Sequence, residues 1–250
     1  MRNQSRTKKK PTAQEIDNAK EYIRRRLAAE NSMEHYLDRK LLLAAKALVS
    51  LAVKHNIPPT LFSFNYDPLI ALEANRIINT LTDEIEEYDF IMATQTDKAD
   101  KDTLLPYINR EINGISYRQR LETYTFGFKL EIQDIIKVGL LANMTQKALV
   151  QTVTALYKRP YTSKLTSHLE HRGQATYARL LTLTRHTIAD TWMFADMESA
   201  RKGGALGFIP FRGSNYPCEV CSDHAGRFHD FSEPYPPFHP HCVCFAVPIY

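Results

Sequence analysis

The C-terminal part of the chain reads Cys218-Glu-Val-Cys221 and, after 17 further residues, His239-Pro-His241-Cys242-Val-Cys244. A C-x2-C turn lets two thiolates converge on one ion, and its backbone amides point at the sulfurs. The second half adds an imidazole and a thiolate at H-x2-C spacing, so the two halves together offer a Cys3His set. Structural zinc prefers such closed tetrahedral sets. We therefore predict a structural Zn²⁺ site whose ligands are Cys218, Cys221, His239 and Cys242.

Two neighbouring donors remain open as substitutes in this site. Cys244 can take the place of Cys242, and His241 that of His239. A disulfide framework is the weaker interpretation, because all four cysteines are clustered and no apolar stretch follows the basic N-terminus as in a signal peptide. A segment of fewer than about 40 residues is rarely stable through the burial of apolar surface alone. A bound metal ion would supply the missing stability here.

Upstream of this segment, apolar residues recur at spacings of three and four, which predicts helices. The expected helices cover residues 12–27, 33–55, 67–88, 104–113, 117–141, 145–156 and 166–200. Thr12 with Glu15 fits a capping box, and Asp67 and Thr145 are expected to cap the helices that they begin. After Gly204 the helical period ends, seven of the 13 prolines follow, and residues 206–212 and 244–249 are expected to form short strands. The predicted fold is mainly α, an elongated helical body with a small Pro-rich C-terminal zinc-knuckle subdomain that contains short β-strands.

These patterns divide the chain into four predicted regions. They are a disordered basic tail (1–11), an N-terminal helical region (12–115), a helical core (116–204) and the zinc-knuckle-like subdomain (205–250). No run reaches the roughly 18–20 apolar residues of a membrane span; the most apolar stretch, 41–53, is too short and contains Lys46. We expect no membrane partner.

The net charge of +4 is concentrated in the N-terminal tail. Its five cations, Arg2, Arg6, Lys8, Lys9 and Lys10, contribute +5, so the other 240 residues sum to 4 − 5 = −1. The tail is either a solubilising extension or an arm that contacts nucleic acid, since clustered cations release counterions from phosphates. The run Arg24-Arg25-Arg26 surrounds a helix on three sides, and we interpret it as a solvated face.

The cysteine segment resembles the C-terminal signature of a known family. Its pattern is Cys218-x2-Cys221-x4-Gly226 followed by Pro236-Pro237-Phe238-His239-Pro240-His241-Cys242-Val243-Cys244, and it is similar to that of the tailed-phage minor head proteins, the head-morphogenesis family typified by the Mu-like minor head protein. Upstream, residues 116–121 look like the family's serine-x-arginine helix, residues 139–145 like the short turn and capped helix that follow it, and residues 171–200 like the long helix that precedes the signature. The resemblance covers about residues 115–250. The chain departs from the family at Val243, where an arginine is usual, and at Arg185, which no Arg-x-Glu pattern follows.

This resemblance implies a structural minor head (capsid) protein of a tailed bacteriophage, acting in head assembly near the portal. It implies a virion or procapsid location after assembly in the host cytoplasm, and the portal or the major capsid protein as partners. Packaged DNA is a further expected partner, through the basic tail. We expect no enzymatic activity.

Two alternatives from other classes stay open. A zinc-knuckle DNA-acting enzyme of the HNH type would use donors such as Asp223, His224, His229 and Asp230, although no helix is expected after them. A general nucleic-acid-binding module would depend on the tail.

Overall fold

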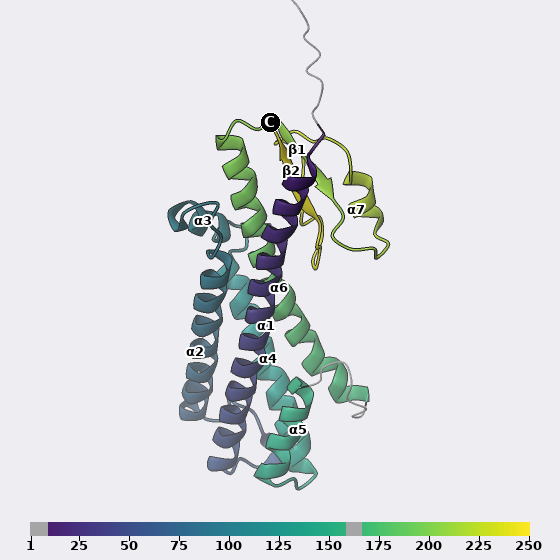
Figure 1. Ribbon diagram of the computed structural model, residues 1–250. Helices are drawn as coiled ribbons and strands as arrows, with labels where there is room; N and C mark the ends of the chain where they lie inside the picture. Colours follow the sequence, from purple (N-terminus) through teal and green to yellow (C-terminus); the bar gives the residue numbers. More distant parts are fainter. Residues whose placement is uncertain (1–9, 159–166) are drawn as a thin grey trace, which may run out of the picture. The chain divides into compact units, whose positions relative to one another are not determined.

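The computed structural model describes the backbone of residues 10–158 and 167–250, and the side chains of residues 10–155 and 176–250. Its elements in chain order are α1 (Ala13–Lys54), η1 (Pro59–Leu61), α2 (Pro68–Ala93), α3 (Lys101–Ile108), α4 (Tyr117–Leu141), α5 (Gln146–Lys158), α6 (Ser167–Lys202), β1 (Gly207–Phe211), α7 (Glu219–His224) and β2 (Phe245–Ile249) (Figure 1).

The predicted fold class is confirmed: the chain is mainly helical, with a small C-terminal two-stranded sheet near the four cysteines. The strands β1 and β2 are antiparallel, and their register pairs Gly207 with Ile249 and Phe211 with Phe245. Both strands lie within one residue of their predicted ranges. The four regions predicted along the sequence stay a prediction.

Some of the helix predictions were wrong. Residues 12–27 and 33–55 form the single helix α1, because the stretch between them contains neither proline nor glycine and buries Ala29 and Met33. The expected helix at 104–113 lies at Lys101–Ile108 instead, with Pro106 inside it. The six-residue helix α7 was not expected, because a segment this short has no detectable helical period.

The helix starts follow from local side-chain chemistry. Thr12 and Glu15 form the predicted reciprocal cap at the start of α1: each backbone N–H donates to the other's side chain, at 2.6 and 3.2 Å. Ser116 and Gln119 do the same at α4. Asp67 Oδ1 accepts from the Leu69 N–H at 2.8 Å, and Thr145 Oγ1 from the Ala148 N–H at 3.2 Å.

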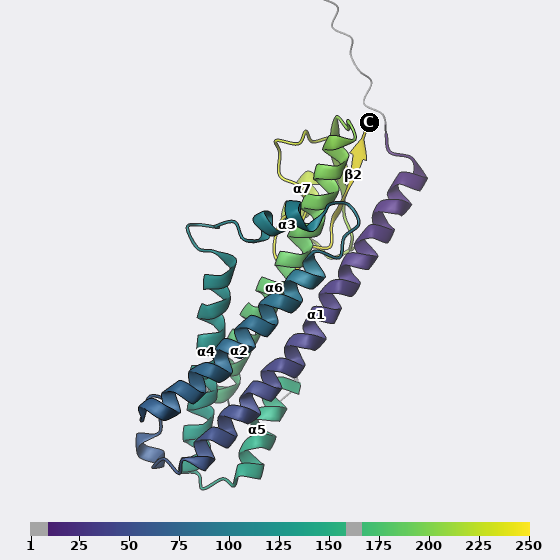
Figure 2. The ribbon, with the colours of Figure 1, turned by 90° about the vertical axis from the view of Figure 1, so that its left-hand side faces the viewer.

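The chain forms two compact units, each assembled from separate segments. Unit 1 contains residues 1–31, 90–108 and 185–250, and unit 2 contains residues 32–89 and 109–184. Within unit 2, α1 and α2 lie side by side and antiparallel, which two views show (Figures 1 and 2). Lys40 Nζ pairs with Glu84 at 2.6 Å, and the rings of Tyr36 and Tyr88 stack with centroids 3.9 Å apart.

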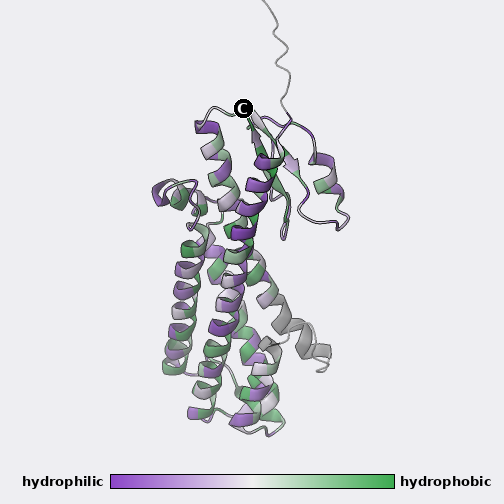
Figure 3. Ribbon diagram, in the orientation of Figure 1, coloured by the Kyte–Doolittle hydropathy of each residue, from purple (hydrophilic) through white to green (hydrophobic). Residues whose placement is uncertain are grey.

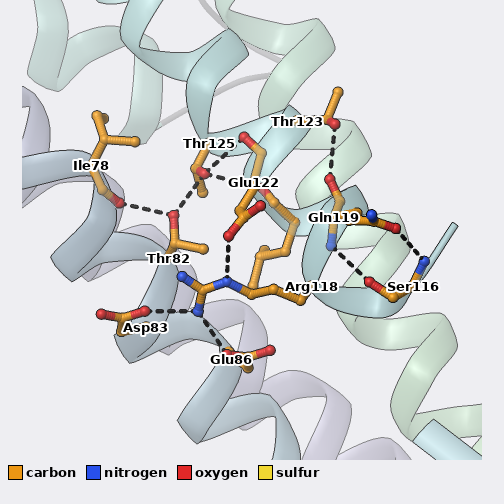
Figure 4. Close-up of polar contacts among 11 residues, drawn as sticks. Ile78, Thr82, Asp83, Glu86, Ser116, Arg118, Gln119, Glu122, Thr123 and Thr125 are labelled. Atoms are coloured by element: carbon orange, nitrogen blue, oxygen red, sulfur yellow. Dashed lines mark hydrogen bonds and ion pairs between the residues drawn. The ribbon is translucent and has the colours of Figure 1, made fainter. Parts of the chain in front are cut away.

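In unit 2, α2 also packs against α4 through polar contacts at the helix surface. Figure 4 shows Arg118 of α4 between Asp83 and Glu86 of α2, with 2.7 Å to each carboxylate, and bonded to Glu122 of its own helix. Beside it the buried hydroxyls of Thr82 and Thr125 lie 2.8 Å apart. The contacts pair early α4 with late α2, so these two helices are antiparallel.

Unit 1 has an aromatic centre that joins three segments. The Tyr22 hydroxyl lies 2.7 Å from both Thr96 Oγ1 and the Trp192 carbonyl oxygen, and the Trp192 indole N–H donates to the Met92 carbonyl at 3.0 Å. Trp192, the single tryptophan of the sequence, is 3% exposed and packs in this core. The C-terminal sheet belongs to the last of these three segments, residues 185–250.

Asp196 of unit 1 gives a pH-dependent prediction. Burial raises the pKa of its carboxyl from 3.8 to about 6, although Lys98 Nζ lies 3.6 Å away. Because the folded-state pKa lies above the unfolded one, Asp196 costs the protein stability as pH rises from about 4 through 6. We expect Asp196→Asn to stabilise unit 1 at pH 7 by up to about 3 kcal/mol and to have little effect at pH 4. Urea unfolding at both pH values measures this difference.

Asp97 is the matched control, because its pKa is shifted in the opposite direction. The hydrogen bond from Arg25 lowers the pKa of this exposed carboxyl, so Asp97 contributes stability that is lost as pH falls. Asp97→Asn should therefore not stabilise the protein at pH 7. An Asp196→Asn variant that is no more stable than wild type at pH 7 would contradict the prediction.

Within the described ranges, no helix is both long enough and apolar enough to cross a membrane. Figure 3 shows the reason in α1 and α2, where hydrophilic and hydrophobic residues are interspersed along each helix (Figure 3).

Candidate metal centre

The first half of the candidate centre is a tight turn closed by α7. Cys218 is the residue before this helix, and the Ser222 N–H donates to the Cys218 carbonyl at 3.0 Å. The backbone N–H of Cys221 donates to the Cys218 sulfur and contributes most to lowering the pKa of that thiol. The turn thus presents two sulfurs on one side, as the C-x2-C spacing predicts.

The second half is held by the sheet. Cys244 directly precedes β2, and the pairing of Phe211 with Phe245 brings the chain after β1 against it. Gly213 approaches the backbone so closely that a Cβ at this position would lie 1.8 Å from the Val243 carbonyl oxygen. Its N–H donates to the Cys244 sulfur. The closing C-x-C is therefore held by the backbone of Gly213, two residues after β1.

The two halves meet in two groups of potential ligands that share one sulfur. Cys218, Cys221 and His239 form one group, and Cys221, Cys242 and Cys244 form the other; within each, the donor atoms all lie within 4.8 Å of one another. Cys221 Sγ lies 3.1 Å from His239 Nε2 and 3.8 Å from Cys242 Sγ. This cluster could bind a metal ion such as zinc.

Some of the distances fit a tetrahedral ion. Bonds of about 2.3 Å from zinc to sulfur place two thiolates of one tetrahedron about 3.8 Å apart, and a sulfur and an imidazole nitrogen about 3.6 Å apart. Cys221 and Cys242 match the first value, while His239 Nε2 lies slightly closer, at 3.1 and 3.3 Å from Cys221 and Cys218. Cys242 does not belong to the group of Cys218, Cys221 and His239, so at least one of its distances to these donors exceeds 4.8 Å and would have to shorten around an ion.

The His239 ring is oriented as in many metal sites. Its Nδ1–H donates to the Pro240 carbonyl oxygen at 2.8 Å, which leaves Nε2 facing the two sulfurs of the C-x2-C turn. A metal-binding histidine usually fixes its tautomer by this kind of hydrogen bond. The same carbonyl is the main reason why the pKa of His239 is raised.

The four thiols differ in acidity. A hydrogen bond with Cys244 lowers the pKa of Cys242 to about 5, whereas the same pairing raises the pKa of Cys244. Burial raises the pKa of Cys221 to about 12. Three of the four sulfurs belong to buried residues, with Cys221, Cys242 and Cys244 at most 5% exposed. The cluster is therefore enclosed by protein on most sides.

The structure brings together three of the four predicted ligands, Cys218, Cys221 and His239, in one group, and places the fourth, Cys242, in the second group with Cys221. Cys244 belongs to the second group, whereas His241 belongs to neither group and its residue is exposed. The choice between Cys242 and Cys244 stays a prediction. Of the predicted nucleic-acid contacts, Lys10 is exposed, and the others, Arg2, Arg6, Lys8 and Lys9, lie outside the described residues.

The donors of the alternative HNH-type site form no group of three or more potential metal ligands within the described part of the chain, although the rings of His224 and His229 lie 5.3 Å apart. His229 Nδ1 lies 2.7 Å from Glu233 and its Nε2 lies 3.2 Å from the His224 carbonyl, so both nitrogens already have local partners. Asp230 accepts from the Ser232 backbone N–H at 2.7 Å. None of these residues belongs to a group of potential metal ligands among the residues described.

One residue near the centre was misread from the sequence. Arg26 was expected on a solvated face, yet it is fully buried and its Nη2 donates to the Cys242 carbonyl oxygen at 3.1 Å. Its neighbours Arg24 and Arg25 are exposed as expected. In the sequence, the only sign that Arg26 is buried is its position three residues after the apolar Ile23 and four before Glu30.

No protein-family profile, curated protein or solved structure matches the chain.

Proposed function

We propose that Cys218, Cys221, His239 and Cys242 bind one structural zinc ion that orders the segment from residue 205 to 250. The observation that carries this proposal is the position of Cys221 Sγ of the first half, which lies 3.1 Å from the imidazole of His239 and 3.8 Å from the thiol of Cys242, both of the second half. A closed set of three thiolates and one imidazole leaves no position for a water molecule or substrate, so the centre is structural. A non-enzymatic role follows from this chemistry.

For the protein as a whole, we propose a minor head protein of a tailed phage that acts in head assembly near the portal. The support is the sequence signature of the cysteine segment, whose closely spaced thiols and histidine meet in space as one cluster. In this proposal the portal or the major capsid protein is the partner, the basic tail contacts packaged DNA, and the protein resides in the virion or procapsid. In this proposal the role of the zinc ion is structural, because it fixes a loop-rich surface that faces a partner.

Zinc content and cobalt spectroscopy test the first proposal. The freshly purified, reduced protein should contain one zinc ion per chain. After exchange, Co²⁺ should show the intense d–d bands of a tetrahedral site and the sulfur-to-cobalt charge transfer of three thiolates. Absence of stoichiometric metal, or an octahedral cobalt spectrum, would refute a structural zinc site.

Co-assembly tests the second proposal. The protein should sediment with procapsids when it is co-expressed with the portal and major capsid proteins of the phage or prophage that encodes it. Metal-dependent cleavage of plasmid DNA that is lost in His229→Ala would instead favour the nuclease alternative. Binding to DNA that disappears on removal of residues 1–10, without any association with particles, would favour the nucleic-acid-binding module.

A further inference from the structure

A groove of about 550 Å³ lies between α1 and α2 within unit 2. Its floor is apolar and is formed by Leu43, Ala44, Ala47, Ile77 and Leu81. Leu43 is 53% exposed, and Leu69, which lies one turn before Glu73 on the same side of α2, is 67% exposed. Exposed leucines beside an apolar groove are typical of a surface that binds another protein.

The two helices carry opposite charges at two levels of this surface. At one level Lys40 Nζ of α1 lies 2.6 Å from Glu84 of α2, and at the other Lys54 Nζ of α1 lies 3.6 Å from Glu73 of α2. The side chains of Glu84 and Glu73 keep exposed fractions of 38% and 48%. Because a carboxylate can accept more than one donor, each of the two can bind a further cation. The α1 side of the surface is thus basic at these levels, and the α2 side is acidic.

This charge pattern is self-complementary for one orientation of two copies. A two-fold axis along the groove places α1 of each copy on α2 of the other at the same level, so Lys40 meets Glu84 and Lys54 meets Glu73 of the other copy. Neighbouring helices are then all antiparallel, as in an up-down-up-down four-helix bundle. An axis perpendicular to the helices would instead set α1 on α1 and α2 on α2, with lysine against lysine and glutamate against glutamate.

The remaining charge of the groove fits the same orientation. Arg76 of α2 lies between the levels of Glu73 and Glu84, where α1 of the other copy offers the uncharged Ala47. The small side chain of Ala47 also lets a facing helix approach closely. The charges that line the groove sum to 2 − 2 = 0 over Lys40, Arg76, Glu73 and Glu84. A neutral groove with both signs favours a hairpin that also carries both signs over a strongly acidic or basic partner.

We propose that this face of unit 2 is a homodimer interface, in which the α1–α2 hairpins of two copies pack as a four-helix bundle around a two-fold axis along the groove. The occupant of the groove is therefore a second copy of this chain. The inference is independent of the metal centre, because the cysteines and His239 belong to unit 1.

Charge reversal tests both the occupant and the orientation. Lys40→Glu places two glutamates against each other across the interface, and Glu84→Lys places two lysines there. Each variant alone should dissociate, with the dimer dissociation constant raised at least about 100-fold. An equimolar mixture of the two should dimerise again, because each glutamate then faces a lysine of the other variant. Sedimentation velocity over a concentration series and native mass spectrometry of the full chain measure these states.

Ala47→Arg tests the groove without changing its charged pairs. Ala47 is exposed, so the longer side chain can be accommodated in the monomer but covers the floor on which the other copy packs. This variant should be monomeric. Asn79→Arg is the matched control, because Asn79 is exposed on α2 and does not line the groove. It should dimerise as wild type does.

Several results would overturn the proposal. They are a wild-type protein that stays monomeric throughout the concentration series, a dimer that survives Ala47→Arg, and charge-reversal variants that are folded by circular dichroism but whose mixture stays monomeric. If the charge-reversal variants do not fold, Ala47→Arg and Asn79→Arg decide. A monomeric wild type that binds a different protein through this groove, with binding lost in Ala47→Arg, would assign another occupant and refute the homodimer.

Discussion

Cys221→Ser is expected to abolish stoichiometric zinc binding and to destabilise unit 1 by several kcal/mol. Cys221 is the one donor common to both groups of potential ligands, so its loss leaves neither group with three donors and removes the sulfur that joins them. A ligand present at 1,000 times its dissociation constant stabilises a fold by about 4 kcal/mol, and that contribution is lost with the site. Unit 2 should keep its helical circular dichroism. The measurements are zinc content and limited proteolysis of the C-terminal segment.

Val220→Ser is the matched control for this variant. Val220 lies on the same turn, between the two thiols, and is 49% exposed, so the substitution places a hydroxyl there without removing a donor. It should retain one zinc ion per chain. Cys242→Ser and Cys244→Ser then assign the fourth ligand, because only the variant that lacks a true ligand loses zinc. Retention of zinc by Cys221→Ser would refute the centre as described.

Gly213→Ala is expected to have the second largest effect. The added Cβ would lie 1.8 Å from the Val243 carbonyl oxygen and 2.7 Å from its carbon, and neither backbone atom can rotate away. The two chain segments must separate, which disturbs the pairing of β1 with β2 and the position of Cys244. We expect a loss of at least about 3 kcal/mol, at the upper end for an overpacked site, together with weaker zinc binding. Thermal unfolding and chelator competition measure the two effects.

Gly203→Ala controls for the general effect of replacing a glycine. Its nearest atoms lie at 3.3 to 3.5 Å from an added Cβ, a distance that small shifts can relieve. This variant should change stability far less than Gly213→Ala. Equal effects of the two substitutions would contradict the close approach at Gly213 as the cause.

Much of the fold follows from local signals in the sequence. The strands on either side of the cysteine segment and the caps at Thr12, Asp67 and Thr145 were all predicted, because each depends on residues within a few positions of one another. The convergence of the C-x2-C turn with His239 also follows from spacing. The continuity of α1 could not be predicted in this way. Local patterns show where a helix can end, but they do not show that it continues past a weakly apolar stretch.

The part that sequence reasoning missed depends on long-range packing. Arg26 shares its local sequence with two exposed arginines, and only the proximity of Cys242, 216 residues away, distinguishes it. Cys244 is likewise placed by Gly213 across the sheet, which no spacing rule reveals. Tertiary contacts of this kind decide which of several chemically equivalent residues belongs to a site.

The separate segments of unit 1 have a consequence for biosynthesis. Its first segment ends at residue 31 and its last begins at residue 185, so the N-terminal turns of α1 emerge from the ribosome long before their partners exist. Contacts so distant along the chain form slowly, because a long loop must close before they contribute. For the proposed zinc site, metal binding is thus expected to be a late step in folding, and chains that have not reached it expose surface that is prone to aggregation.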